Sequence, residues 1–210
     1  MFESAELDHT LDKARFEREA ERLRADLLDL QYDVLAAARF PVVVLINGLE
    51  GAGKGETANL LNAWMDSRHI ETHAFPELMH GEREHPPMWR FWQALPPKGK
   101  TGLLLGNWYF DPITERAERR IKDAELTARI DDILRFEKML ADEGALLIKF
   151  WLDLSRRKQK RRLLALQDDP DTRWRVTPHD WKLYEHYDRY VDAADRVLRE
   201  TSRAHAPWTV

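Results

Sequence analysis

The sequence predicts an α/β protein with a mostly parallel sheet. Short apolar runs alternate along the chain with longer amphipathic segments, as strands alternate with helices in βαβ units. The runs are continuously apolar, which is typical of strands covered on both faces. With 210 residues, 43% of them hydrophobic, the chain can bury one core but is too short for two full domains.

The first helix is predicted from Phe16 to Val34. Apolar residues recur there at steps of four and three with charged residues between them, and Pro41 ends the helix. We expect its apolar face to pack on the sheet, with a helix–helix dimer seam as the alternative. Residues 1–39 then form an amino-terminal helical segment of a single-domain protein whose α/β part is residues 40–210.

The other elements follow in the second segment. The run 42–46 predicts a buried central strand, and helical spacing resumes over residues 57–65. Residues 69–100, which include many Pro and His, predict mostly loop with one short helix around 89–92. The remaining predicted elements are a strand at 103–105, a charged helical region at 114–142, a strand at 145–152, a basic helix from Ser155 and a strand at 206–210.

Charge and composition exclude several classes of function. The 33 basic and 37 acidic residues leave a net charge of -4, which argues against a chain built to bind nucleic acid or an acidic membrane. The chain has no Cys, so disulfides, thiolate metal sites and Cys nucleophiles are excluded. We find no signal peptide and no apolar run of the roughly 18 residues that a membrane span needs, and we expect a cytoplasmic protein.

A glycine-rich segment between the first strand and the next helix fits a phosphate-binding loop. Residues 48–55 contain the G-x-x-x-x-G-K core of a P-loop. Glycines let successive backbone N–H groups point at an anion, and Lys54 adds a mobile ammonium. The alternative is a tight turn with a solvated lysine. The predicted phosphate-binding residues are Gly48, Gly51, Ala52, Gly53, Lys54 and Gly55.

The last position of this loop departs from the ordinary motif. Gly55 stands where other P-loop enzymes place the Ser or Thr whose hydroxyl holds Mg²⁺. Glu50 is the carboxylate inside the loop and can bind a phosphate-bound Mg²⁺, since that ion commonly uses one or two carboxylates. Capping of the following helix is the alternative role of Glu50.

The segment after Ser155 is a second candidate anion site. Six of its next seven residues are cations, although cations in the first turn oppose the helix dipole, and no acid occurs from 156 to 167. We interpret residues 155–180 as a lid whose arginines neutralise a transferred phosphoryl group; a solvated charged surface is the alternative. The candidate lid residues are Arg156, Arg157, Lys158, Lys160, Arg161, Arg162 and Arg173.

Further motifs are specific and cover nearly the whole chain. Residues 48–55 fit a G-x-D-x-x-G-K-G loop apart from Glu50, Glu82 precedes the aromatic group 89–92, and residues 147–152 lead to Arg161-Arg162, Arg173-Trp174 and 204–208. In these motifs the chain resembles the family-2 polyphosphate kinases, and within them the amino-terminal half of the two-domain members.

The resemblance implies a three-layer α/β/α, P-loop kinase-like fold with a helical lid and Mg²⁺ as cofactor. It implies transfer of a terminal phosphoryl group between polyphosphate and AMP or ADP, in a homo-oligomer or beside a second fused domain. The implied catalytic residues are Lys54, Glu50, Arg161 and Arg162. The residues assigned to nucleotide binding or to support of the site are Glu82, Arg90 and Trp174.

Two departures from the family pattern bear on activity. Glu50 replaces an Asp, and Leu105-Gly106-Asn107 replace the Asp-Arg-Ser or Asn-Arg-Ser of active members. Losing one side chain that stabilises the charge of the transition state at a phosphoryl site costs about 10³-fold in rate. The alternative function is therefore a catalytically weakened domain that binds polyphosphate or supports a second, active domain.

A third hypothesis is a nucleotide kinase that uses ATP as donor, which Gly55 disfavours. If the replacement of the family's acidic or amide residue and arginine by Leu105-Gly106 weakens catalysis, we expect Leu105→Asp with Gly106→Arg to raise turnover.

Overall fold

A parallel five-stranded sheet lies at the centre of the computed structural model, which describes residues 11–76 and 80–210. The strand order is β2-β3-β1-β4-β5, and each neighbouring pair is parallel. The strands are β1 (Val42–Gly48), β2 (Ile70–Ala74), β3 (Thr101–Leu105), β4 (Leu146–Leu152) and β5 (Trp208–Thr209).

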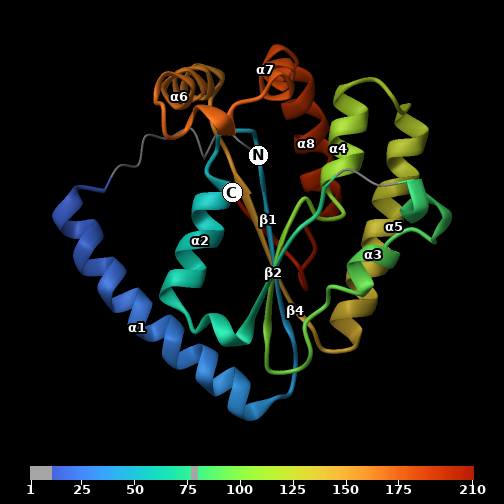
Figure 1. Cartoon of the computed structure of the whole chain (residues 1–210). Helices are drawn as coiled ribbons and strands as arrows, with labels where there is room; N and C mark the ends of the chain where they lie inside the picture. Colours follow the sequence, from blue (N-terminus) through green and yellow to red (C-terminus); the bar gives the residue numbers. More distant parts are fainter. Residues whose placement is uncertain (1–10, 77–79) are drawn as a thin grey trace.

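Helices cover both faces of this sheet and give three layers (Figure 1). One face carries α1 (Lys13–Ala37) and α2 (Lys54–Trp64). The other carries α4 (Phe110–Ala117), α5 (Asp123–Asp142) and α8 (Tyr187–Thr201), with the single-turn α3 (Trp89–Trp92) beside α5. The predicted α/β class with a mostly parallel sheet is confirmed.

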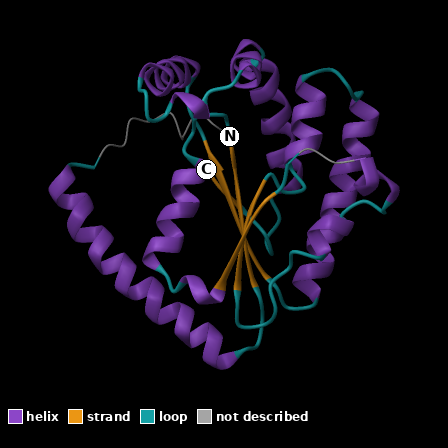
Figure 2. Ribbon diagram, viewed as in Figure 1, coloured by secondary structure: helices purple, strands orange, loops and turns teal. Residues whose placement is uncertain are grey.

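Two further helices lie above the carboxyl ends of the strands (Figure 2). They are α6 (Arg156–Asp168) and α7 (Pro178–Glu185), joined through the 3₁₀ turn η4 (Arg173–Arg175). Two other 3₁₀ turns, η2 (Ser67–His69) and η3 (His80–Glu84), flank β2. None of the described helices is both long enough and apolar enough to cross a membrane.

The central strand β1 is buried along its whole length. Val43 and Leu45 pack with the cluster that includes α4, α5 and α8, whereas Val44 and Ile46 pack with Ala58 of α2 on the opposite face. Successive side chains of a strand point to opposite faces, so a strand between two helix layers buries both sets, and residues 42–46 are accordingly all apolar. Burial on both faces is therefore the reason that the apolar run at residues 42–46 is continuous.

The sequence did not reveal two features of the secondary structure. Residues 69–100 were expected to be mostly loop, yet residues 70–74 form the edge strand β2, in which Ile70 is the buried residue. An edge strand with one covered face leaves too weak an apolar signal to find. The helical region 114–142 is two helices, because Arg119 adopts a left-handed φ of 61° between α4 and α5.

The apolar face of α1 packs on the sheet only near its carboxyl end. Gln31 is buried there, donating to Asp66 O at 2.9 Å and accepting from Asp66 N at 2.7 Å. Phe16, Leu23 and Leu30 are exposed, so the expectation that the whole face covers the sheet was wrong. The helix is longer than the sheet layer it meets and extends away from it (Figure 1).

A fully buried ion pair links β4 to α5. Lys149 and Glu137 are both 0% exposed, and Lys149 Nζ lies 2.8 Å from Glu137 Oε2. The ammonium also donates to Tyr109 Oη and to Thr201 O, while Glu137 Oε1 accepts from Tyr109 Oη and Trp108 Nε1. Burial lowers the pKa of Lys149, with Glu137 opposing the shift, and burial and then Glu137 raise the pKa of Tyr109. The pair therefore anchors the chain just after β3.

Candidate functional site

The predicted phosphate-binding loop, called the phosphate loop below, joins β1 to α2. Gly53 is the N-cap of α2 and has a φ of 98°, a left-handed conformation that strains residues with a side chain. The seven residues of β1 and the eleven of α2 fix both ends of the loop. The strand, glycine loop and helix predicted from the sequence are therefore present, and the amino end of α2 faces the site with its partial positive charge.

Lys54 is held inside this loop. Its Nζ donates to Gly48 O at 3.0 Å and to Leu49 O at 3.2 Å. It also forms an ion pair with Glu50 Oε1 at 2.8 Å, with 20% of the Lys54 side chain and 26% of the Glu50 side chain exposed. The two predicted catalytic groups of the loop therefore neutralise each other in this arrangement.

The phosphate loop and the basic helix α6 line one cleft. Gln159 of α6 is buried and donates to Glu50 O at 2.9 Å. A Cβ on Gly51 would lie 3.9 Å from Arg162 Cδ and 3.9 Å from a methyl of the buried Leu163. Between them is a cavity of about 110 Å³, whose lining includes Lys54 and Glu56 of α2 and, from the predicted lid, Arg162, Arg175 and Asp180.

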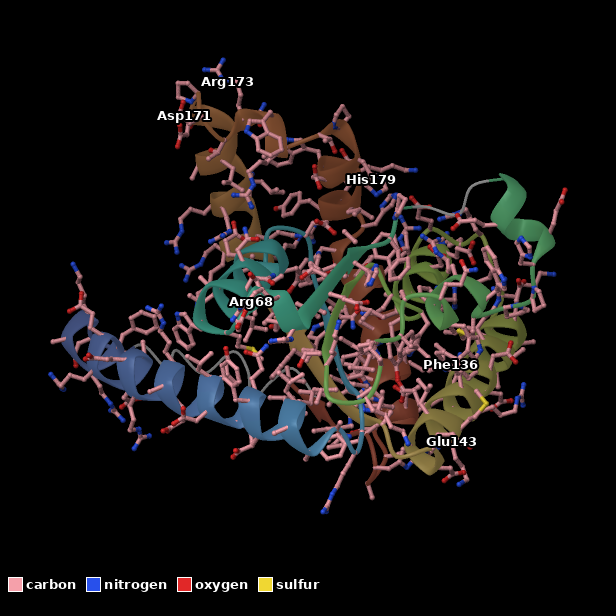
Figure 3. The ribbon with its side chains drawn as sticks, turned by 60° about the horizontal axis from the view of Figure 1, so that its bottom comes forward. Arg68, Phe136, Glu143, Asp171, Arg173 and His179 are labelled. Carbon is pink, nitrogen blue, oxygen red and sulfur yellow. The ribbon has the colours of Figure 1, made fainter. Side chains whose placement is uncertain are left out.

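The cations of α6 point in different directions. Among the described residues that line the cleft, Arg162 is the only one of the predicted lid cations. Arg156 pairs with Asp188 of α8 at 3.0 Å, and Lys158 is half-buried. Arg157, Lys160 and Arg161 on α6 and Arg173 on η4 are exposed and line no part of the cleft as described. Figure 3 shows Arg173 at the outer tip of the predicted lid, directed away from the body.

Glu56 and Arg175 belong to the cleft although the sequence did not single them out as site residues. Arg175 Nη2 donates to Glu56 Oε1 at 2.6 Å, and Arg162 Nη2 lies 3.3 Å from the same oxygen. Desolvation would raise the pKa of Glu56, but the bonds and charges of Arg175 and Arg162 lower it below its ordinary value. An acid in the first turn of a helix is common, so the sequence carried no signal for this contact.

A larger cavity of about 500 Å³ lies beyond the end of β3. Its lining combines aromatic and charged side chains, and the ring of Trp89 stacks on that of His85 at a centroid distance of 3.8 Å. Arg90 is buried at its edge, donates to Pro76 O at 2.8 Å, and lies over the Phe75 ring. The charged residues around this cavity include Glu82, Asp111, Glu115, Arg120, Arg129 and Asp132.

The structure brings only part of the predicted nucleotide group together. Glu82 and Arg90 both line the larger cavity, with Arg90 Nε 3.5 Å from Glu82 Oε1. Trp174 lies on η4, is 76% exposed, and donates its ring N–H to Asp171 O. It lines neither of the two cavities.

Comparison with known proteins shows the family of this chain. Residues 10–210 match the family model described as polyphosphate kinase 2. The chain belongs to this family. A polyphosphate:AMP phosphotransferase of Pseudomonas aeruginosa is 54% identical over 210 residues, which are 100% of this chain and 42% of that protein. An AMP/ADP-polyphosphate phosphotransferase of Meiothermus ruber is 29% identical over 188 residues, covering 90% of this chain and 70% of that protein.

Solved structures of the polyphosphate kinase 2 family share the fold. The crystal structure of a putative polyphosphate kinase 2 from Pseudomonas aeruginosa has a TM-score of 0.88 and 51% identity, covering 100% of this chain and 42% of that chain. The polyphosphate kinase 2 from Arthrobacter aurescens has a TM-score of 0.92 and 28% identity, covering 97% of this chain and 74% of that chain. The chain thus spans less than half the length of its Pseudomonas relatives.

In this member of the family, the segment after β3 cannot accept the substitution pair expected to restore activity. Gly106 has a φ of 63°, and a Cβ there would lie 2.4 Å from Phe75 O. Phe75 N in turn donates to Leu105 O at 2.9 Å, and the buried Asn107 donates to Leu104 O. Gly106→Arg would therefore force the backbone of residue 75 away, so the expected gain of turnover from the double substitution does not follow.

Gly106→Ala is expected to lower the free energy of unfolding by about 2 kcal/mol, because a left-handed backbone and a close contact are both strained by a methyl group. Chemical denaturation followed by fluorescence measures this loss. Gly55→Ala is the matched control, since Gly55 lies in α2 with nothing within 4 Å of its added Cβ. A loss no greater than that of the control would show that the turn relaxes freely.

Proposed function

We propose that this chain is a phosphotransferase domain that moves a terminal phosphoryl group between polyphosphate and AMP or ADP. The observation that carries the proposal is the single cleft in which the phosphate loop meets Arg162 and Arg175. This cleft follows β1, and the larger cavity follows β3, the neighbouring parallel strand. Ligand sites of open parallel sheets are found at this edge, outside the carboxyl ends of the strands.

Donor and acceptor fit the two cavities by their chemistry. Polyphosphate carries repeated oxyanions, which Lys54, Arg162 and Arg175 can neutralise with charge-assisted hydrogen bonds. The larger cavity offers Trp89 to a nucleobase and Arg120 and Arg129 to a nucleoside phosphate. In-line transfer needs the two phosphates held end to end and the developing charge neutralised, so positioning and cations supply the catalysis.

Mg²⁺ fits the loop through Glu50. The described residues contain no group of three or more His, Asp or Glu side chains that could hold a metal ion. A single carboxylate is sufficient where phosphate oxygens and water complete the coordination, and Glu50 lines the cleft beside the loop glycines. Mg²⁺ would neutralise phosphate charge there, after Glu50 exchanges its ion pair with Lys54 for the metal.

The geometry after β3 favours a second candidate function. Gly106 and the Phe75 backbone fill the place where the resemblance to active members implies an arginine. A domain that binds polyphosphate with little turnover, and that supports an active partner domain, is the function that follows if no other cation replaces it.

Two reaction mixtures distinguish these functions. The chain is given AMP and Mg²⁺ with polyphosphate in one mixture and with ATP in the other, and ADP is followed by chromatography. In the ATP mixture, one control without enzyme and a second control without AMP correct for ADP released from ATP. ADP formed only from polyphosphate supports the proposal, while AMP-dependent ADP formed only from ATP indicates an ordinary nucleotide kinase. Polyphosphate binding without ADP in either mixture, and without ATP when ADP replaces AMP as the acceptor for polyphosphate, supports the binding domain.

A further inference from the structure

We propose that Glu56 is a built-in competitor for polyphosphate, a carboxylate that latches the lid arginines to the phosphate loop until the polyanion displaces it. The inference rests on the proposed function for the identity of the polyanion. It adds a role for a side chain of α2 that the loop motif does not include.

The position of the Glu56 carboxylate carries the inference. One of its oxygens receives both lid guanidinium groups, from Arg175 at 2.6 Å and from Arg162 at 3.3 Å. Its other oxygen lies 3.9 Å from the Cβ that a side chain on Gly53 would have. The carboxylate therefore stands at the mouth of the loop between two arginines, a position in which a phosphate oxygen would find the same donors.

The contact joins separate elements across the cleft. Glu56 belongs to α2, Arg162 to α6 and Arg175 to η4. The first half of α6 has its own attachment, because Gln159 donates to Glu50 O and Leu163 is buried. Thr172 Oγ1 donates to Leu166 O, so η4 stays folded against the end of α6. Releasing Glu56 is therefore expected to loosen residues 164–177 while the beginning of α6 stays in place.

The latch is weak enough to be exchanged. The side chains of Glu56, Arg162 and Arg175 are 44%, 42% and 37% exposed, and ion pairs at such exposures are screened by salt and contribute little each. Polyphosphate offers several oxyanions to the same arginines and to Lys54, so it can replace one carboxylate. Until it does so, Glu56 lowers the apparent affinity, because binding must first break its two ion pairs and then tolerate its charge.

Glu56→Gln tests both halves of the inference. In the free protein, amide hydrogen exchange over residues 164–177 is expected to become faster than in wild type. In calorimetric titration with sodium polyphosphate at low salt, the dissociation constant is expected to fall by about three- to ten-fold. Glu185→Gln is the control, since it removes one exposed carboxylate from the neighbouring α7 and is expected to change affinity by less than about two-fold.

Arg175→Gln separates competition from a purely structural role. It breaks the same latch from the other side, so exchange over residues 164–177 should again rise, but polyphosphate should now bind more weakly. Opposite signs for the two variants support the inference. Unchanged exchange in Glu56→Gln, or an affinity no tighter than that of the control, overturns it. Absence of polyphosphate binding by the wild-type chain overturns the proposed function instead, and the exchange result still decides whether the latch exists.

Discussion

Lys54→Met is expected to weaken polyphosphate binding by about 100-fold at low salt, because an ammonium that bonds phosphate oxygens contributes roughly 1.5–3 kcal/mol for each such bond. The substitution has a second effect in this chain. Lys54 pairs with Glu50 at 2.8 Å, so its removal leaves an unpaired carboxylate inside the phosphate loop. That carboxylate repels the ligand, and the salt dependence of binding should become flatter as one phosphate contact is lost.

Lys160→Met is the matched control for this measurement. It removes the same charge from an exposed position of α6, outside the described lining of the cleft. A loss of about two-fold or less is expected, since a solvated cation acts on the ligand only through a screened field. Equal losses in the two variants would mean that polyphosphate is held by the general charge of the lid and not by the loop.

Lys149→Met is expected to lower the free energy of unfolding by about 3–5 kcal/mol, because it leaves a buried carboxylate without its counter-charge. Glu137 would keep only its hydrogen bonds from Trp108 and Tyr109, with no access to water. Denaturation by urea, monitored by tryptophan fluorescence, measures the loss. The effect should reach the site, since Trp108 and Tyr109 fix the chain that leads to the larger cavity.

The double variant Glu137→Leu with Lys149→Met shows whether charge is the cause. Replacing both partners by apolar groups removes the uncompensated charge, so a good part of the stability should return. Tyr109 Oη and Thr201 O would lose partners, which keeps the recovery incomplete. A single Lys149→Met variant that loses less than about 1 kcal/mol would show that Glu137 takes up a proton or reaches water when Lys149 is absent.

Prediction of the fold from the sequence succeeded where burial is complete and failed where burial is partial. Every residue of β1 is covered by a helix layer, so the run from Val42 is unmistakably apolar. In β2 the residues after Ile70 are half-buried or exposed and include Glu71 and His73, which resemble a loop. The apolar stripe of α1 gave the helix correctly but not its packing, because periodicity shows that a face is apolar and not what it meets.

The candidate site divides in the same way. The loop was predictable because Gly53 and Lys54 belong to a motif that is local in sequence. The sequence identified the cations of α6 as a group. Which of them faces the loop depends on the rotation of the helix about its axis, and in the folded chain Arg162 faces it. Glu56 and Arg175 are 119 residues apart and meet only in the folded chain.

The restriction at Gly106 was also invisible in the sequence. From the sequence alone, a glycine in place of an arginine indicates only a missing charge. The structure shows that Phe75 O occupies the space that a side chain at position 106 would need. Substitutions that restore a motif therefore succeed only where the chain still leaves room for the side chain.

The central claim, that polyphosphate lies between the phosphate loop and the lid, is tested most directly by amide hydrogen exchange with and without polyphosphate in the presence of Mg²⁺. We predict slower exchange in residues 49–57 and 159–177, with little change in α1 or in the exposed end of α5. Protection confined to other surfaces, or no protection at saturating polyphosphate, would contradict the claim.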